Sequence, residues 1–140
     1  MDSLECLTAD HFDLDTFSQI LEMDDSEEDR DFSRGIVYGY FEQAENTLES
    51  MQTGLVEKDF ESLNQLSHFL KGSAATLGLW RIRDGCEKIQ NLSAGRHLHN
   101  PRDEAADNKA FEEITSLVNE TVIESGTCET LLRKFYEGSN

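Results

Sequence analysis

A histidine, a lysine and a glycine lie within about one helical turn in the stretch "HFLKGSAATLGL" at residues 68–79. The imidazole of His68 can act as a nucleophile or a proton carrier near neutral pH. Lys71 lies close to one turn further on, where its positive charge could hold an anion at the ring. A glycine inside a helix lowers the stability of the helix by roughly 1 kcal/mol compared with alanine. Gly72 is explained if another molecule must approach the backbone closely. The stretch therefore combines a reactive ring, a nearby positive charge and a backbone that can be approached closely.

The helical projection of this segment turns His68 away from the apolar face. At about 100° per residue, His68 lies about 140° from Leu63, whereas Gly72 and Ala75 lie beside the histidine. The same projection turns the side chain of Ser73 away from His68. A surface histidine on a helix most often has no role, but the combination of charge and small neighbours on one patch favours a function. The apolar residues that share the opposite face are Leu63, Leu66, Leu70, Ala74 and Leu77.

The regular spacing of apolar residues predicts one short helix and four long helices. We expect Gly54 and Gly78 to end the second and third helices. The pair Ser125–Gly126 could bend the last one. The expected apolar stripe of the second helix is Phe32, Ile36, Tyr40, Ala44, Leu48 and Met51, and the helices span about 15–23, 29–53, 58–77, 80–98 and 109–136.

Four long amphipathic helices with short connections predict an all-α, antiparallel up-down-up-down four-helix bundle with a short extra N-terminal helix. The 140 residues suggest a single domain over 1–140. Strand-like runs of β-branched residues are missing, and Pro101 is the only proline.

The formal net charge of −17 argues against nucleic acid and anionic membranes as partners, because their phosphates would be repelled. No apolar stretch approaches the length of a membrane span, and the acidic N-terminus resembles neither a signal peptide nor a transit peptide. Half of the basic residues lie between Lys71 and Arg102.

Motifs for metal binding and for nucleotide binding are missing from the sequence. Three cysteines, Cys6, Cys86 and Cys128, form no CxxC pair, which predicts reduced thiols in an intracellular protein and neither a disulfide framework nor a zinc site. The histidines other than His68, at positions 11, 97 and 99, lack zinc-ligand spacing. Without a GxxxxGK[ST] loop or a glycine-rich lid, ATP is not an expected substrate.

The pattern around His68 resembles the histidine-containing phosphotransfer (HPt) family, and is closest to its fungal phosphorelay intermediates. The family pattern of a histidine, any residue, an apolar residue, lysine, glycine, small residues and a later glycine is met over 68–78, and "CEKIQNL" follows at 86–92. The acidic stretch "MDDSEEDRDFSRG" at 23–35 is similar to the linker of the fungal proteins. The resemblance covers about residues 14–98 and is only architectural for the last helix, which follows a shorter loop than in some relatives.

The resemblance implies a role for each matching residue. His68 would carry the phosphoryl group, Lys71 would stabilise it by charge, and Gln90 on the adjacent helix would orient the imidazole. Residues that would leave clearance for the phosphoryl group and an incoming receiver domain are Gly72, Ser73 and Ala75, with Ser73 further from the ring.

The resemblance also implies the partners. A receiver domain of a hybrid sensor histidine kinase would donate phosphate, and a response-regulator receiver would accept it. The chain would be a carrier and not an ATP-dependent enzyme, with no cofactor or metal of its own, and Mg²⁺ would come from the receiver. We expect a monomer in cytoplasm and nucleus. Apolar candidates for docking are Ile20, Met23 and Phe69, while the basic residues of 71–102 could face an acidic receiver pocket.

Two other functions fit the sequence. One is a noncatalytic helical adaptor that binds partners through the same apolar residues. The other is a transition-metal-binding bundle that uses the scattered histidines.

Overall fold

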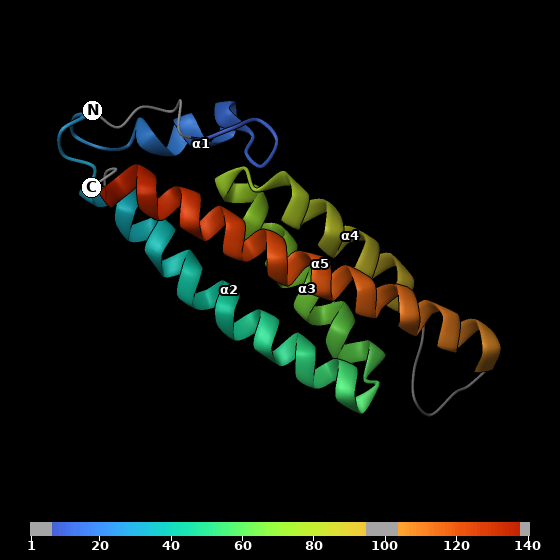
Figure 1. Ribbon diagram of the computed structural model, residues 1–140. Coiled ribbons are helices and arrows are strands. Elements are labelled where there is room, and N and C mark those ends of the chain that lie inside the picture. The colour runs from blue at the N-terminus through green and yellow to red at the C-terminus, as the bar shows by residue number, and fades with distance from the viewer. Residues whose placement is uncertain (1–6, 95–103, 138–140) are drawn as a thin grey trace.

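The computed structural model describes residues 7–94 and 104–137, which form helices and no strands. The short α1 lies across one end of the bundle, and the four long helices run antiparallel in chain order (Figure 1). Each long helix packs against its two neighbours in a closed ring. This arrangement confirms the predicted all-α four-helix bundle. The helices are α1 (Leu14–Leu21), α2 (Asp31–Glu57), α3 (Phe60–Leu77), α4 (Trp80–Ser93) and α5 (Glu104–Glu137).

Short-range hydrogen bonds fix the two ends of α3. Asp59 caps the start, because its Oδ1 accepts a hydrogen bond of 3.1 Å from the backbone N–H of Ser62. Hydrogen bonds from Ser62 lower the pKa of Asp59. Gly78 ends the helix with a φ of 78°, and its N–H donates to the carbonyl of Ala75 over 3.1 Å. The predicted glycine stop at this position is correct.

Two other predicted helix ends were wrong by more than two residues. The second helix continues past Gly54 to Glu57, and Lys58 supplies the left-handed residue at φ 52°. A Cβ on Gly54 would lie 3.3 Å from the side chain of Leu63, so this glycine allows close packing of α2 on α3. The last helix begins earlier than predicted, at Glu104, and continues through residues 125–126 without a break. The predicted end of the fourth helix at 98 lies outside the described residues.

The buried face of α2 is rotated from the predicted stripe at its start. Phe32 is 55% exposed and Ile36 is 37% exposed, whereas Ser33 and Val37 are fully buried. The reason is a polar contact that periodicity does not reveal. The hydroxyl of Ser33 donates to Asp24 and accepts a hydrogen bond of 2.8 Å from Tyr136 of α5. The predicted inward positions from Tyr40 onward are buried, as expected.

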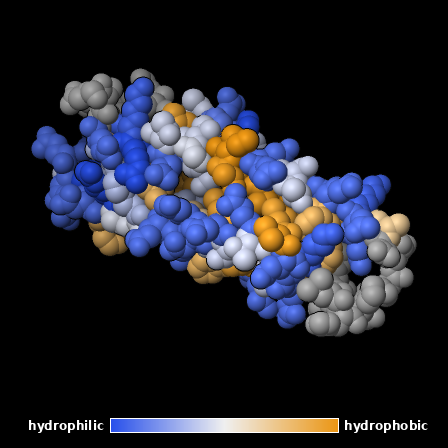
Figure 2. Space-filling model, turned by 60° about the horizontal axis from the view of Figure 1, so that its bottom comes forward, coloured by the Kyte–Doolittle hydropathy of each residue, from blue (hydrophilic) through white to orange (hydrophobic). Residues whose placement is uncertain are grey.

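The core is continuous across the described helices. Phe17 of α1 meets Phe135 of α5 edge to face, with ring centroids 5.8 Å apart, so the short helix closes the end of the bundle. Hydrophilic side chains cover much of the face in Figure 2, with an apolar area near its middle. None of the described helices combines the length and the apolar composition of a membrane span.

Candidate functional site

His68 lies on the exposed face of α3, as the helical projection predicts. The short connection at Gly78 and Leu79 folds α4 back along α3, which brings Gln90 opposite the histidine. The amide of Gln90 lies within hydrogen-bond distance of the imidazole, with its Nε2 3.2 Å from Nδ1 of His68. The predicted contact between Gln90 and the ring is therefore present.

A second polar layer holds the backbone that carries Gln90. Asn64, one turn before His68 on α3, donates a hydrogen bond of 2.8 Å to the carbonyl oxygen of Gln90. The same amide nitrogen lies 3.2 Å from the hydroxyl of buried Ser93. These contacts tie α3 to α4 beside the histidine and fix the position from which Gln90 reaches the ring.

The orientation of the Gln90 amide determines which ring nitrogen can react. In the orientation described, Oε1 of Gln90 is buried and has no hydrogen-bond partner among the described residues. Carbonyl and amino ends of a glutamine are assigned from their hydrogen bonds, and turning the amide places Oε1 against Nδ1. In this turned orientation Oε1 would accept a hydrogen bond from the Nδ1–H of His68. This tautomer leaves the Nε2 lone pair of the exposed ring directed to solvent, where it can act as a nucleophile.

The surface just beyond His68 is open. Apart from its two chain neighbours and the backbone of its own helix, no described atom lies within 4 Å of a Cβ added to Gly72, so the fold itself does not require a glycine there. An open hollow of about 380 Å³ begins at this glycine, between α3 and α4. Its lining residues are Lys71, Gly72, Ala75, Arg83, Asp84 and Glu87. The three predicted residues Lys71, Gly72 and Ala75 therefore share one accessible hollow.

Ser73 does not belong to this hollow. Its hydroxyl donates a hydrogen bond of 3.1 Å to Oε1 of Gln43 on α2, so the side chain faces a different neighbour from His68. This agrees with the predicted direction of Ser73. Gln43 and Ser93 were not identified from the sequence, because nothing in their spacing links them to α3. Asn64 could have been found, since it precedes His68 by one helical turn.

The predicted docking residues differ in exposure. Met23 is 60% exposed and Phe69 is 48% exposed, as a docking surface requires. Ile20 is only 6% exposed, which corrects its assignment to the surface, because α1 turns this side chain into the core. Apolar residues at the start of α2 that the prediction placed inside, Phe32 and Ile36, are exposed instead.

Comparison with known families identifies this bundle. Residues 36–122, more than half of the chain, match the Hpt domain family. The chain belongs to this family. The matched segment of the HPt chain includes His68, Gln90 and every residue that lines the hollow.

Curated relatives of this HPt domain come from yeasts. It is 51% identical over 84 residues to multistep phosphorelay regulator 1 of Schizosaccharomyces pombe, covering 60% of this chain and 28% of that protein. It is 49% identical over 76 residues to phosphorelay intermediate protein YPD1 of Saccharomyces cerevisiae, covering 54% of this chain and 44% of that protein. The matched segments thus span less than half the length of either relative.

Solved structures share the whole bundle. The crystal structure of yeast Ypd1p has a TM-score of 0.77 and 27% identity, and the match covers 96% of this chain and 99% of that one. Saccharomyces cerevisiae Ypd1, described as a histidine phosphotransfer signaling protein, has also been crystallised with the receiver domain of its downstream response regulator Ssk1. That chain has a TM-score of 0.78 and 30% identity, and the match covers 94% of this chain and 97% of that one.

Proposed function

We propose that this HPt domain is a phosphorelay carrier in which His68 takes a phosphoryl group from an aspartyl phosphate and passes it to another aspartate. The observation that supports this function best is the exposed imidazole whose Nδ1 is engaged by Gln90. A ring held in this way presents Nε2 in a fixed direction, beside the open surface at Gly72.

The chemistry of the step balances with the residues present. Nε2 of His68 attacks the phosphorus of the aspartyl phosphate, a P–N bond forms, and the P–O bond to the aspartate breaks. The aspartate leaves as a carboxylate, and the proton on Nδ1 stays on the ring and continues to donate to Gln90. In the second step a carboxylate oxygen of the acceptor attacks phosphorus and the P–N bond breaks, which restores the neutral imidazole.

Lys71 would supply positive charge beside the phosphoryl group. It is half-buried, one turn beyond His68, and lines the same hollow as Gly72. A positive charge there would offset charge that develops on the transferred group. The sequence around His68 has no carboxylate set with metal-ligand spacing, so we propose that the receiver domain supplies Mg²⁺.

The proposed partners follow from the resemblance and from the relatives. The donor would be the receiver domain of a hybrid sensor histidine kinase, and the acceptor the receiver domain of a response regulator. Yeast Ypd1 was crystallised with the receiver domain of a response regulator, which supports this class of acceptor. We further propose that the carrier acts as a monomer, in cytoplasm and nucleus.

A transfer assay tests the proposal directly. A receiver domain labelled on its aspartate with radioactive phosphate is mixed with the purified chain in the presence of Mg²⁺. We expect label to move to this chain in a form that is labile in acid and stable in base, as phosphohistidine is. Absence of label on the wild-type chain would contradict the function. A complex with the receiver that forms without any transfer would favour the adaptor.

Replacement of Gln90 by leucine is expected to slow phosphoryl transfer about 10- to 100-fold, because a ring that is free to turn is misplaced for in-line attack. The matched control is Asn91→Leu, an exposed residue on the same helix. Initial rates of label transfer, together with thermal melts of both variants, measure the effect. Equal rates for the two variants would show that Gln90 does not position the imidazole.

Replacement of Gly72 by leucine is expected to leave the fold intact and to weaken transfer. Beyond the two chain neighbours and the backbone of α3, no described atom lies within 4 Å of an added Cβ, so the new side chain occupies space that a docked receiver needs. Overpacking of an interface costs about 1–3 kcal/mol, which corresponds to roughly 5- to 150-fold in rate at low receiver concentration. Gly126→Leu, at an equally open glycine of α5, is the control. Wild-type rates in Gly72→Leu would show that the clearance is not used.

A further inference from the structure

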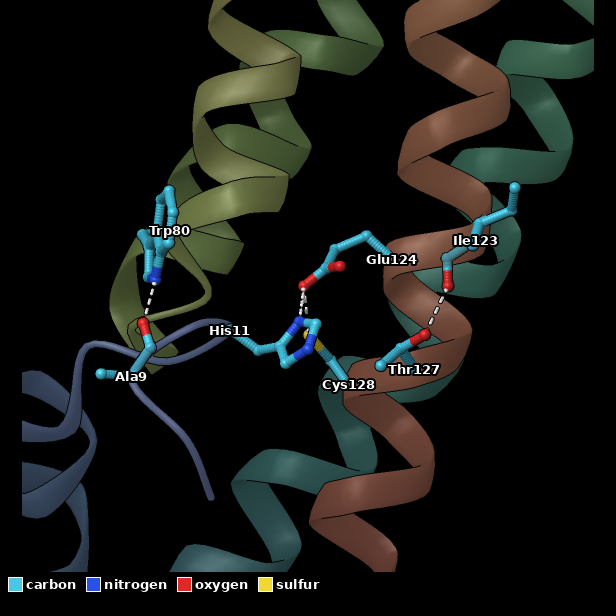
Figure 3. A network of polar contacts seen from close by, with 7 residues as sticks. All are labelled: Ala9, His11, Trp80, Ile123, Glu124, Thr127 and Cys128. Carbon is cyan, nitrogen blue, oxygen red and sulfur yellow. Dashed lines mark hydrogen bonds and ion pairs between the residues drawn. The ribbon is translucent and has the colours of Figure 1, made fainter.

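A histidine, a glutamate and a cysteine meet between the segment before α1 and the middle of α5. Nδ1 of His11 lies 2.7 Å from Oε2 of Glu124, and Sγ of Cys128 lies 3.3 Å from the same oxygen. The three potential donor atoms all lie within 4.8 Å of one another. Figure 3 shows the ring of His11 reaching from the N-terminal segment toward Glu124, with the sulfur of Cys128 close to the ring.

The scaffold holds these three groups in place. Glu124 and Cys128 are one helical turn apart on α5, so their side chains share a face. The segment that carries His11 is fixed by Phe12, which is 1% exposed. On its other side, the indole Nε1 of Trp80 donates a hydrogen bond of 3.0 Å to the carbonyl of Ala9 (Figure 3). His11 is therefore directed at α5 before any ligand arrives, which lowers the entropic cost of binding.

The set of donors has the chemistry of a zinc site. An imidazole nitrogen, a carboxylate oxygen and a thiolate sulfur are the three ligand types that Zn²⁺ binds in proteins. Donor atoms around a tetrahedral zinc ion are separated by roughly 3–4 Å, given zinc–ligand distances of about 2.0–2.3 Å. The contact of 2.7 Å between His11 and Glu124 would have to open by about half an ångström. The ligand nitrogen of His11 lies within 4.8 Å of the Cys128 sulfur.

We propose that His11, Glu124 and Cys128 bind one divalent cation of the zinc class, with water in the fourth position. On binding, the Cys128 S–H bond breaks, a sulfur–metal bond forms, and the proton leaves to solvent. The ion replaces the hydrogen bond between His11 and Glu124 and links the N-terminal segment to α5. This site is separate from His68, and it adds a metal to a chain for which the sequence spacing predicted none.

Zinc binding by the full chain, stripped of metal with a chelator, tests the proposal. Zn²⁺ is titrated against a chromophoric chelator of known affinity, and Co²⁺ is used as a spectroscopic probe of a thiolate ligand. We expect one equivalent of zinc to bind, and a thiolate-to-cobalt absorption band that disappears in Cys128→Ala. Loss of an outer-shell group around a metal costs about 10- to 100-fold in affinity, so loss of a ligand should cost at least as much.

Each cluster variant has a matched control. His11→Ala is compared with His68→Ala, and Cys128→Ala with Cys86→Ala, a second buried cysteine. Because either cysteine variant could unfold, the decisive pair is Glu124→Gln against Glu120→Gln, one turn away on the same helix. Loss of affinity only in the cluster variants supports the site. The proposal is overturned if the wild-type chain binds no zinc, or if Glu124→Gln binds as tightly as Glu120→Gln.

Discussion

Replacement of His68 by glutamine is expected to abolish transfer of label from a phosphorylated receiver domain. The amide of glutamine offers no nucleophilic lone pair comparable to that of the imidazole, so the P–N bond cannot form. Because His68 is exposed, the free energy of unfolding should change by no more than about 0.5 kcal/mol. Autoradiography of the transfer reaction and a urea denaturation curve measure the two effects.

The control for this variant is His11→Gln. His11 is half-buried against Glu124 and lies outside the surface around His68, so it should retain wild-type transfer. Label that persists in His68→Gln would refute the assignment of the phosphorylated residue, even if the chain is a carrier. If both variants lost the label, the cause would be a general effect on the fold and not the loss of the phosphorylated residue.

Replacement of Gly78 by alanine is expected to destabilise the protein by about 2–5 kcal/mol. The φ of 78° costs an L-residue about 1–2 kcal/mol. An added Cβ would also lie only 2.6 Å from the carbonyl oxygen of Asp13, so the segment before α1 would have to move. That movement strains the hydrogen bond of 2.7 Å from the N–H of Asp13 to the carbonyl of Gly78. Such overpacking typically costs a further 1–3 kcal/mol.

Gly72→Ala is the matched control for Gly78→Ala. Gly72 lies inside α3, and Gly78 is the residue that ends the same helix. Gly72 has helical backbone and open space around it, so alanine should stabilise the protein by up to about 1 kcal/mol. The two free energies of unfolding, measured by urea denaturation, should therefore change with opposite signs. A loss of less than about 0.5 kcal/mol in Gly78→Ala would show that the turn tolerates a side chain, contrary to the geometry.

Local features of the sequence determined the fold class and the reactive residue. Regularly spaced apolar residues specify helices, because the residues of a buried helix face must recur with the period of the helix. The position of His68 relative to Leu63 and Leu70 determined that the ring faces outward, since both are buried. Gly78 was recognisable as a helix end because a left-handed residue favours glycine. The pattern from His68 to Gly78 was specific enough to indicate the family.

Only the tertiary structure decided features that depend on which helix lies beside which. Ile20 was expected to take part in docking, and periodicity placed Ile36 inside. Both expectations were wrong, because the face that is buried depends on the neighbouring helices and on polar contacts such as that of Ser33. The end of the second helix was misplaced for a related reason, since Gly54 serves packing and not termination.

The cluster of His11, Glu124 and Cys128 shows this limit most clearly. His11 and Glu124 are 113 positions apart in the chain, so no motif of ligand spacing reveals them. Cys128 looked like an isolated thiol in the sequence. The bundle brings the start of the chain against α5, and this long-range contact alone creates a site of three donor atoms. The sequence determined the helices and the histidine that faces solvent, whereas folding determined which distant side chains share one position in space.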